Sequence, residues 1–105
     1  MTTAFDKMQV ERIEMVGDFY FRSVALPFAG MRIPQHTHDH DHATFVGSGR
    51  VRGWRDGECL GEKSRGEAFY IQAGHAHWFE ALEDQTLLTC VHSIASAMSI
   101  QRKGL

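Results

Sequence analysis

Four histidines occupy alternate positions in the middle of this sequence: His36, His38, His40 and His42. In an extended strand, side chains at positions i and i+2 point to the same face. We therefore expect at least His36 and His38 to converge on one point. Imidazole nitrogens that converge in a protein interior usually bind a transition metal. The spacing predicts a metal site.

The segments around these histidines are short, apolar and separated by turn signals, which is typical of an all-β sandwich or barrel. Residues 8–16 fit either a strand or one helical turn. Such a strand-rich chain must remove its free edges, and a closed or double-sheet barrel does so. The expected strands cover residues 19–26, a histidine strand entered through Pro34, 42–46, 50–55, 59–63, 68–72, 75–82 and 86–94.

Length and composition limit the possible classes of protein. Of the 105 residues, 43% are apolar and 23% are charged, which fits one globular domain over residues 1–105. The formal charge of −2 gives no indication of binding to nucleic acid or to an anionic membrane. No segment reaches the ~18 apolar residues of a membrane span, and the polar N-terminus lacks a signal-peptide core. Cys59 and Cys90 form no C-x-x-C pair, which favours free thiols and a cytoplasmic location.

Two spaced motifs in the chain resemble those of the cupin superfamily. The first cupin motif, G-x5-H-x-H-x(3,4)-E-x6-G, is similar to Gly30-x5-His36-x-His38-x3-His42-x6-Gly49. The second, G-x5-P-x-G-x2-H-x3-N, is similar to Gly66-x5-Gln72-x-Gly74-x2-His77-x3-Ala81. The resemblance covers about residues 28–94, and it is specific because two separately spaced motifs fit together.

The resemblance implies an all-β, single-domain cupin barrel, a double-stranded β-helix of the jelly-roll type, and a homodimer. It also implies that His36, His38 and His77 bind one divalent metal inside the barrel. A solvated loop that chelates metal adventitiously is the alternative, but such a loop needs no partner as distant as His77. The chain departs from the motifs at three positions, where His42 replaces glutamate, Gln72 replaces proline and Ala81 replaces asparagine.

The replacement at His42 changes the expected chemistry. As a fourth ligand, His42 would leave a divalent ion with its full charge of +2, which strengthens polarisation of a bound oxygen and disfavours a higher oxidation state. An all-nitrogen set suits iron, manganese, nickel, zinc or copper. Two positions of an octahedral metal would stay open for water, dioxygen or substrate. Alternatively, His42 only lies beside the metal.

Strand alternation extends the list of candidate pocket residues. Thr44 and Val46 are in register with His42, Phe79 is in register with His77, and Cys90 and His92 share a face of the last expected strand. A packed core is the alternative for the last two. His92 and His40 are weak candidates for proton transfer, and a solvated rim position is the alternative for His40. We expect His75 to be exposed, whereas Arg50, Arg52 and Trp54 form either an anion anchor or the polar side of a hairpin.

Two functions fit these residues. The first is a small metalloenzyme, a dioxygenase, isomerase or lyase in type, that acts on a small oxygenated organic molecule. The second is a non-catalytic binding or sensor domain that uses the metal to hold a sugar or carboxylate ligand. Neither function involves nucleic acid or a membrane.

Overall fold

The computed structural model describes residues 9–93, in which nine β-strands are joined by turns and short loops. All nine pair in antiparallel fashion. The strands are β1 Gln9–Val16, β2 Phe19–Leu26, β3 Arg32–His36, β4 His42–Ser48, β5 Arg50–Arg55, β6 Glu58–Ser64, β7 Ala68–Ile71, β8 His77–Ala81 and β9 Thr86–Ser93.

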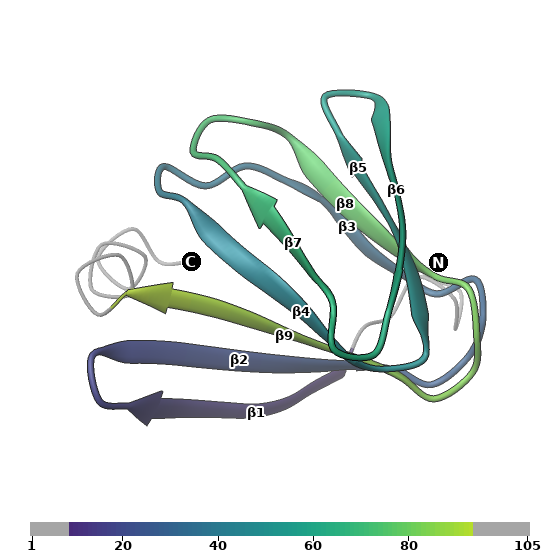
Figure 1. Cartoon of the computed structure of the whole chain (residues 1–105), viewed down its shortest axis with the longest axis horizontal. Coiled ribbons are helices and arrows are strands. Elements are labelled where there is room, and N and C mark those ends of the chain that lie inside the picture. Colours follow the sequence, from purple (N-terminus) through teal and green to yellow (C-terminus); the bar gives the residue numbers. More distant parts are fainter. Residues whose placement is uncertain (1–8, 94–105) are drawn as a thin grey trace, which may run out of the picture.

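The strands form two sheets. One sheet has the order β1-β2-β9-β4-β7 and the other has the order β3-β8-β5-β6. Figure 1 shows the first sheet as a fan from β1 to β7, with β3, β8, β5 and β6 forming the second layer. The expected all-β double-stranded β-helix of two antiparallel sheets is confirmed.

The core lies between the two sheets because apolar residues alternate along the strands. In β2, Tyr20, Val24 and Leu26 are buried, and the strand gives its other face to the outside. A half-buried sheet favours this period of two. The largest fully buried apolar side chains are Phe79, Leu26, Ile71, Leu88, Val24, Val46 and Val51.

Several expected strand bounds differ from the structure. Of residues 8–16, which fitted a strand or a helical turn, residues 9–16 form strand β1 and pair with β2, and residue 8 lies outside the described residues. The histidine strand ends at His36, and β8 begins at His77 rather than at residue 75. Strand β9 ends at Ser93, and residue 94 lies outside the described residues. Across residues 9–93, no helix is long and apolar enough to cross a membrane.

Gly49 is the single residue between β4 and β5, and it links the two sheets. Its φ of +76° lies in the left-handed region that glycine tolerates best. A Cβ atom there would lie 2.8 Å from the Thr86 Cα atom, which is backbone and cannot rotate away. Both the conformation and the close approach therefore require glycine.

We expect Gly49→Ala to lower the free energy of unfolding by about 2–4 kcal/mol, because left-handed strain and overpacking add. Gly61→Ala is the matched control, since Gly61 also has a positive φ, +95°, but has open space around its Cβ position. That control should lose only about 1 kcal/mol. Urea unfolding of the two variants measures the difference, and equal losses would contradict the role of the Thr86 contact.

Candidate metal centre

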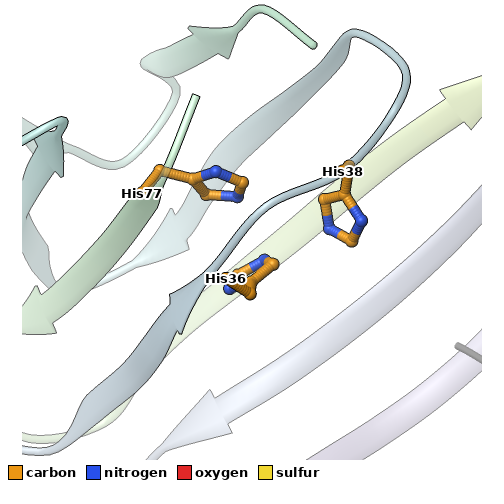
Figure 2. Close-up of side chains that lie close together, drawn as sticks. All are labelled: His36, His38 and His77. Atoms are coloured by element: carbon orange, nitrogen blue, oxygen red, sulfur yellow. The ribbon is translucent and has the colours of Figure 1, made fainter. Parts of the chain in front are cut away.

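Three histidines from two distant segments meet at one point. One ligand nitrogen from each of His36, His38 and His77 lies within 4.8 Å of the others. The ring centroids of His36 and His77 are 4.1 Å apart, and those of His36 and His38 are 4.7 Å apart. Figure 2 shows the three rings around one common space, from the end of β3, the loop after it and the start of β8.

A β-bulge in β3 turns His36 toward His77. Ile33 pairs with Phe79, but the next pair is His36 with His77, so β3 contains one residue more than β8 between the two pairs. Strict alternation from buried Ile33 would point His36 away from the core. The extra residue reverses this alternation, and Pro34 is tolerated there because a bulge interrupts the ladder.

His38 reaches the site from a loop, which corrects the expectation from strand spacing. Strand β3 ends at His36, and His38 lies in the non-strand segment before β4. The two histidines therefore meet because the chain bends after β3, and not because they share a face of one strand.

Backbone hydrogen bonds orient two of the rings. His36 Nδ1–H donates to the Pro34 carbonyl at 2.8 Å, and His77 Nδ1–H donates to the His75 carbonyl at 3.1 Å. Each bond leaves the lone pair on Nε2, the arrangement usual for a metal-bound histidine. Among the described residues, the buried Nε2 of His77 has no hydrogen-bond partner. A buried polar atom of this kind calls for a ligand.

Burial keeps the cluster uncharged. Desolvation by burial is the main reason that the pKa values of His36 and His77 are lowered. The pKa of His38 falls to about 3, through burial first and then through the neighbouring histidines. Only neutral imidazole has a lone pair to offer a metal, so these groups fit a divalent transition ion without further proton loss.

His42, at the start of β4, lies beside the three histidines. Its ring centroid is 5.0 Å from that of His77 and 5.1 Å from that of His38. Its side chain is buried, and its Nδ1 has no partner among residues 9–93. Burial, followed by the charges of nearby histidines, lowers its pKa to about 3. His42 thus lies next to the cluster as an uncharged imidazole, while the nitrogens that lie within 4.8 Å of one another belong to His36, His38 and His77.

Two further histidines extend the cluster. His40 Nε2 and His92 Nδ1 share a hydrogen bond of 3.0 Å, and the His92 ring stacks on His42 at 5.1 Å. His40 Nδ1 donates to the Asp39 carboxylate at 3.1 Å. His75 lies apart, with its Nδ1 hydrogen-bonded to the Asp56 carboxylate. The weak candidates His40 and His92 are therefore neighbours of the site, whereas His75 is not.

A cavity of about 510 Å³ opens next to the histidines. Of the four expected pocket residues, Phe79 and Cys90 line it. Thr44 and Val46 do not line it, because both are buried in the core, where the Thr44 hydroxyl lies 3.6 Å from Cys90 Sγ. The lining residues are Tyr20, Arg22, Val24, Ile33, Pro34, Gln35, His36, Thr37, His38, Asp39, Phe79, Cys90 and His92.

Sequence reasoning missed Arg22. Alternation in residues 19–26 would have found it, since Arg22 shares a face with buried Tyr20 and Val24.

The possible anion anchor formed by Arg50, Arg52 and Trp54 does not lie at this site. Arg50 and Arg52 point away from the core and both pair with Glu62, at 2.9 and 2.8 Å.

Comparisons with known proteins agree with this geometry. A family model of the cupin domain matches residues 23–92. No curated protein matches the chain. Among solved structures, KdgF from Halomonas sp. has a TM-score of 0.69 and 25% sequence identity, and the match covers 78% of this chain and 74% of that one.

Two other structural neighbours share the fold at lower identity. A cupin-2 domain protein from Shewanella frigidimarina has a TM-score of 0.64 at 19% identity, covering 81% of this chain and 82% of that one. An RmlC-like cupin with a double-stranded β-helix fold, from Methanocaldococcus jannaschii, has a TM-score of 0.68 at 13% identity, covering 84% and 81%. With both motifs in one barrel and a family match over most of the motif-bearing region, the chain belongs to the cupin family.

Proposed function

We propose that His36, His38 and His77 bind one divalent transition metal and that His42 completes the ligand set. The unpartnered, buried Nε2 of His77 at the convergence of the three rings is the observation that carries this proposal. Two nitrogens on one metal lie at most about 4.2 Å apart, given metal–nitrogen bonds of about 2.1 Å. The nitrogens of His36, His38 and His77 lie within 4.8 Å of one another, so small rotations of the rings would bring them to ligand distance of one metal. The donor set suits iron, manganese, nickel, zinc or copper.

We infer that the protein is a small metalloenzyme acting on an oxygenated organic molecule. When bound, the metal would polarise a substrate oxygen as a Lewis acid. The cavity beside His36 and His38 has the volume of a small-molecule site, and its wall is mostly apolar. His92 lines this cavity and shares one proton with His40 between Nδ1 and Nε2. His92 is therefore the residue best placed to take up a proton from a ligand.

A non-catalytic binding or sensor domain is the second candidate function. The observation in its favour is that Asp39, the one carboxylate of the cavity wall, already accepts a hydrogen bond from His40. The wall thus offers no free carboxylate as a general base. Such a domain would use the metal to hold a sugar or carboxylate without turnover.

We also propose that the protein is a homodimer that buries the outer face of the sheet β1-β2-β9-β4-β7. Four large apolar side chains on this face are exposed: Val16, Phe19, Phe45 and Tyr70. Exposed apolar side chains that gather on one face are typical of an interface between protein chains.

For metal binding, we expect the untagged protein to hold stoichiometric metal, and His77→Gln to remove it. His75→Gln is the matched control, because His75 is two residues away and contributes only its backbone carbonyl to the site. Elemental analysis after dialysis against trace metal gives the stoichiometry, and circular dichroism checks that each variant is folded.

His42→Gln separates a direct ligand from a neighbour of the metal. Loss of a hydrogen-bond partner outside the ligand set weakens metal affinity about 10–100-fold. We expect a larger loss, together with a changed visible spectrum of the cobalt-loaded protein. Stoichiometric metal in His77→Gln, or an unchanged cobalt spectrum in His42→Gln, would contradict the proposed ligand set.

For the activity, we expect iron-loaded protein to consume dioxygen, or otherwise convert substrate, with one of diketones, flavonols or thiols. The same compounds are tested for ligand-induced thermal stabilisation. Turnover supports the enzyme. Saturable stabilisation with no product in any metal form supports the binding domain instead.

For the dimer, we expect light scattering to give the mass of two chains, and Phe45→Lys to give the mass of one. Phe28→Lys is the matched control, because Phe28 is also exposed (56%, against 44% for Phe45) but lies in the loop between β2 and β3. A wild-type monomer, or a dimer that survives Phe45→Lys, would refute this interface.

A further inference from the structure

Arg22 is a half-buried cation on the wall of the 510 Å³ cavity. It lies in β2 with its side chain on the inner face, between buried Tyr20 and Val24. Its register partner in β9 is Cys90, which lines the same cavity. The guanidinium group is therefore held next to the histidine cluster by two central strands of a sheet, which gives it a defined place.

Within residues 9–93, no hydrogen bond, ion pair or ring contact engages the Arg22 guanidinium. Other arginines in this part of the chain do have partners: Arg12 pairs with Glu14, Arg50 and Arg52 pair with Glu62, and Arg32 lies over Trp78. A cation taken out of water without a partner carries a desolvation cost that an anionic ligand removes.

The rest of the wall does not neutralise this charge. Asp39 is the only carboxylate among the lining residues, and its Oδ1 atom accepts from His40. Much of the remaining wall is apolar, including Val24, Ile33 and Phe79.

The positive charge of Arg22 also acts on two of the nearby histidines. Burial mainly lowers the pKa values of His36 and His92, and the positive charge of Arg22 lowers both further.

We propose that Arg22 binds a carboxylate group of the ligand, so that the ligand is a small organic acid with a second oxygen facing His36 and His38. This inference rests on the proposed metal site, which would receive that second oxygen. The planar guanidinium matches the two oxygens of a carboxylate with paired hydrogen bonds. One arginine in a largely apolar wall pairs with one carboxylate group, which leaves the second oxygen of the ligand for the proposed metal site.

The proposal is tested by direct binding. The zinc-loaded and metal-free proteins are titrated with glycolate, lactate, malate and tartrate, with the corresponding amides, and with inorganic phosphate. Calorimetry gives the affinities, and nitrogen-15 NMR follows the Arg22 Nε–H group. We expect at least one acid to bind saturably and to shift that signal, whereas its amide does not. Arg22→Gln should weaken this binding at least about tenfold, as expected for a lost charge-assisted hydrogen-bond pair.

Two further variants make the result specific. Arg65→Gln removes an equal charge from an exposed turn and should leave the affinity unchanged. Arg22→Lys keeps the charge but loses the paired geometry, and it should bind with intermediate affinity. Equal affinity of Arg22→Gln and wild type, tighter binding of phosphate than of every acid, or no saturable binding by any acid would overturn the proposal.

The outcomes also separate this inference from the metal site. If Arg22→Gln still holds stoichiometric zinc but acid binding does not depend on Arg22, only the carboxylate assignment fails. If the wild type holds no zinc but malate or another acid still shifts the Arg22 signal, the metal site fails and the anion site remains.

Discussion

The pairing of β3 with β8 is the constraint on which the rest of the site depends. It places Ile33 opposite Phe79 in the core and His36 opposite His77 in the histidine cluster. A slip of one residue would turn every side chain of a strand to the other face. The buried Ile33 and Phe79 therefore fix the register that also brings the histidines together, and the bulge between the two pairs gives both of them an inward orientation. The packing of Ile33 on Phe79 and the placement of His36 next to His77 both follow from the alignment of β3 with β8.

The electrostatic character of the site follows from its donor groups. Cupins of the usual pattern place a glutamate where this chain has His42, and that carboxylate would offset part of a metal's charge. Here burial lowers the pKa values of His36, His38, His42 and His77, which keeps these groups uncharged, and Arg22 adds a positive charge nearby. A site of this kind attracts anionic ligands, and the proposed metal ligands include no carboxylate that would repel them. The proposed organic acid would therefore offset positive charge from both the proposed metal and Arg22.

Much of the fold was predictable from local patterns. Residues 19–26 are rich in aromatic and apolar residues and end before Pro27, residues 50–55 end before the Asp56-Gly57 turn, and both strands have the expected bounds. The resemblance of the two motifs to those of cupins implied that His36, His38 and His77 lie together, and the structure brings these three residues to one point. Strand alternation gave the wrong reason for the meeting of His36 and His38, since neither the bulge nor the bend after β3 has a signal in the local periodicity.

Other features of the site depend on contacts between remote strands. Arg22 lines the cavity because β2 lies next to β9, and the bond between His40 and His92 joins a loop to the last strand. Thr44 and Val46 have the same parity as His42, but they lie too deep in the core to reach the cavity. Alternation reports which face a residue occupies and not how far along the strand the cavity extends.

The way the chain crosses between the two sheets has a consequence for folding. Strand β2 belongs to one sheet, β3 to the other, β4 and β5 to opposite sheets, and the same exchange occurs at β7, β8 and β9. Neither sheet is a continuous piece of chain, so each one depends on pairing between strands that are distant in the sequence. Such non-local pairing is associated with slow folding of β-proteins. The interleaved connections also favour loss of structure as one cooperative event, in which the cavity disappears together with the barrel.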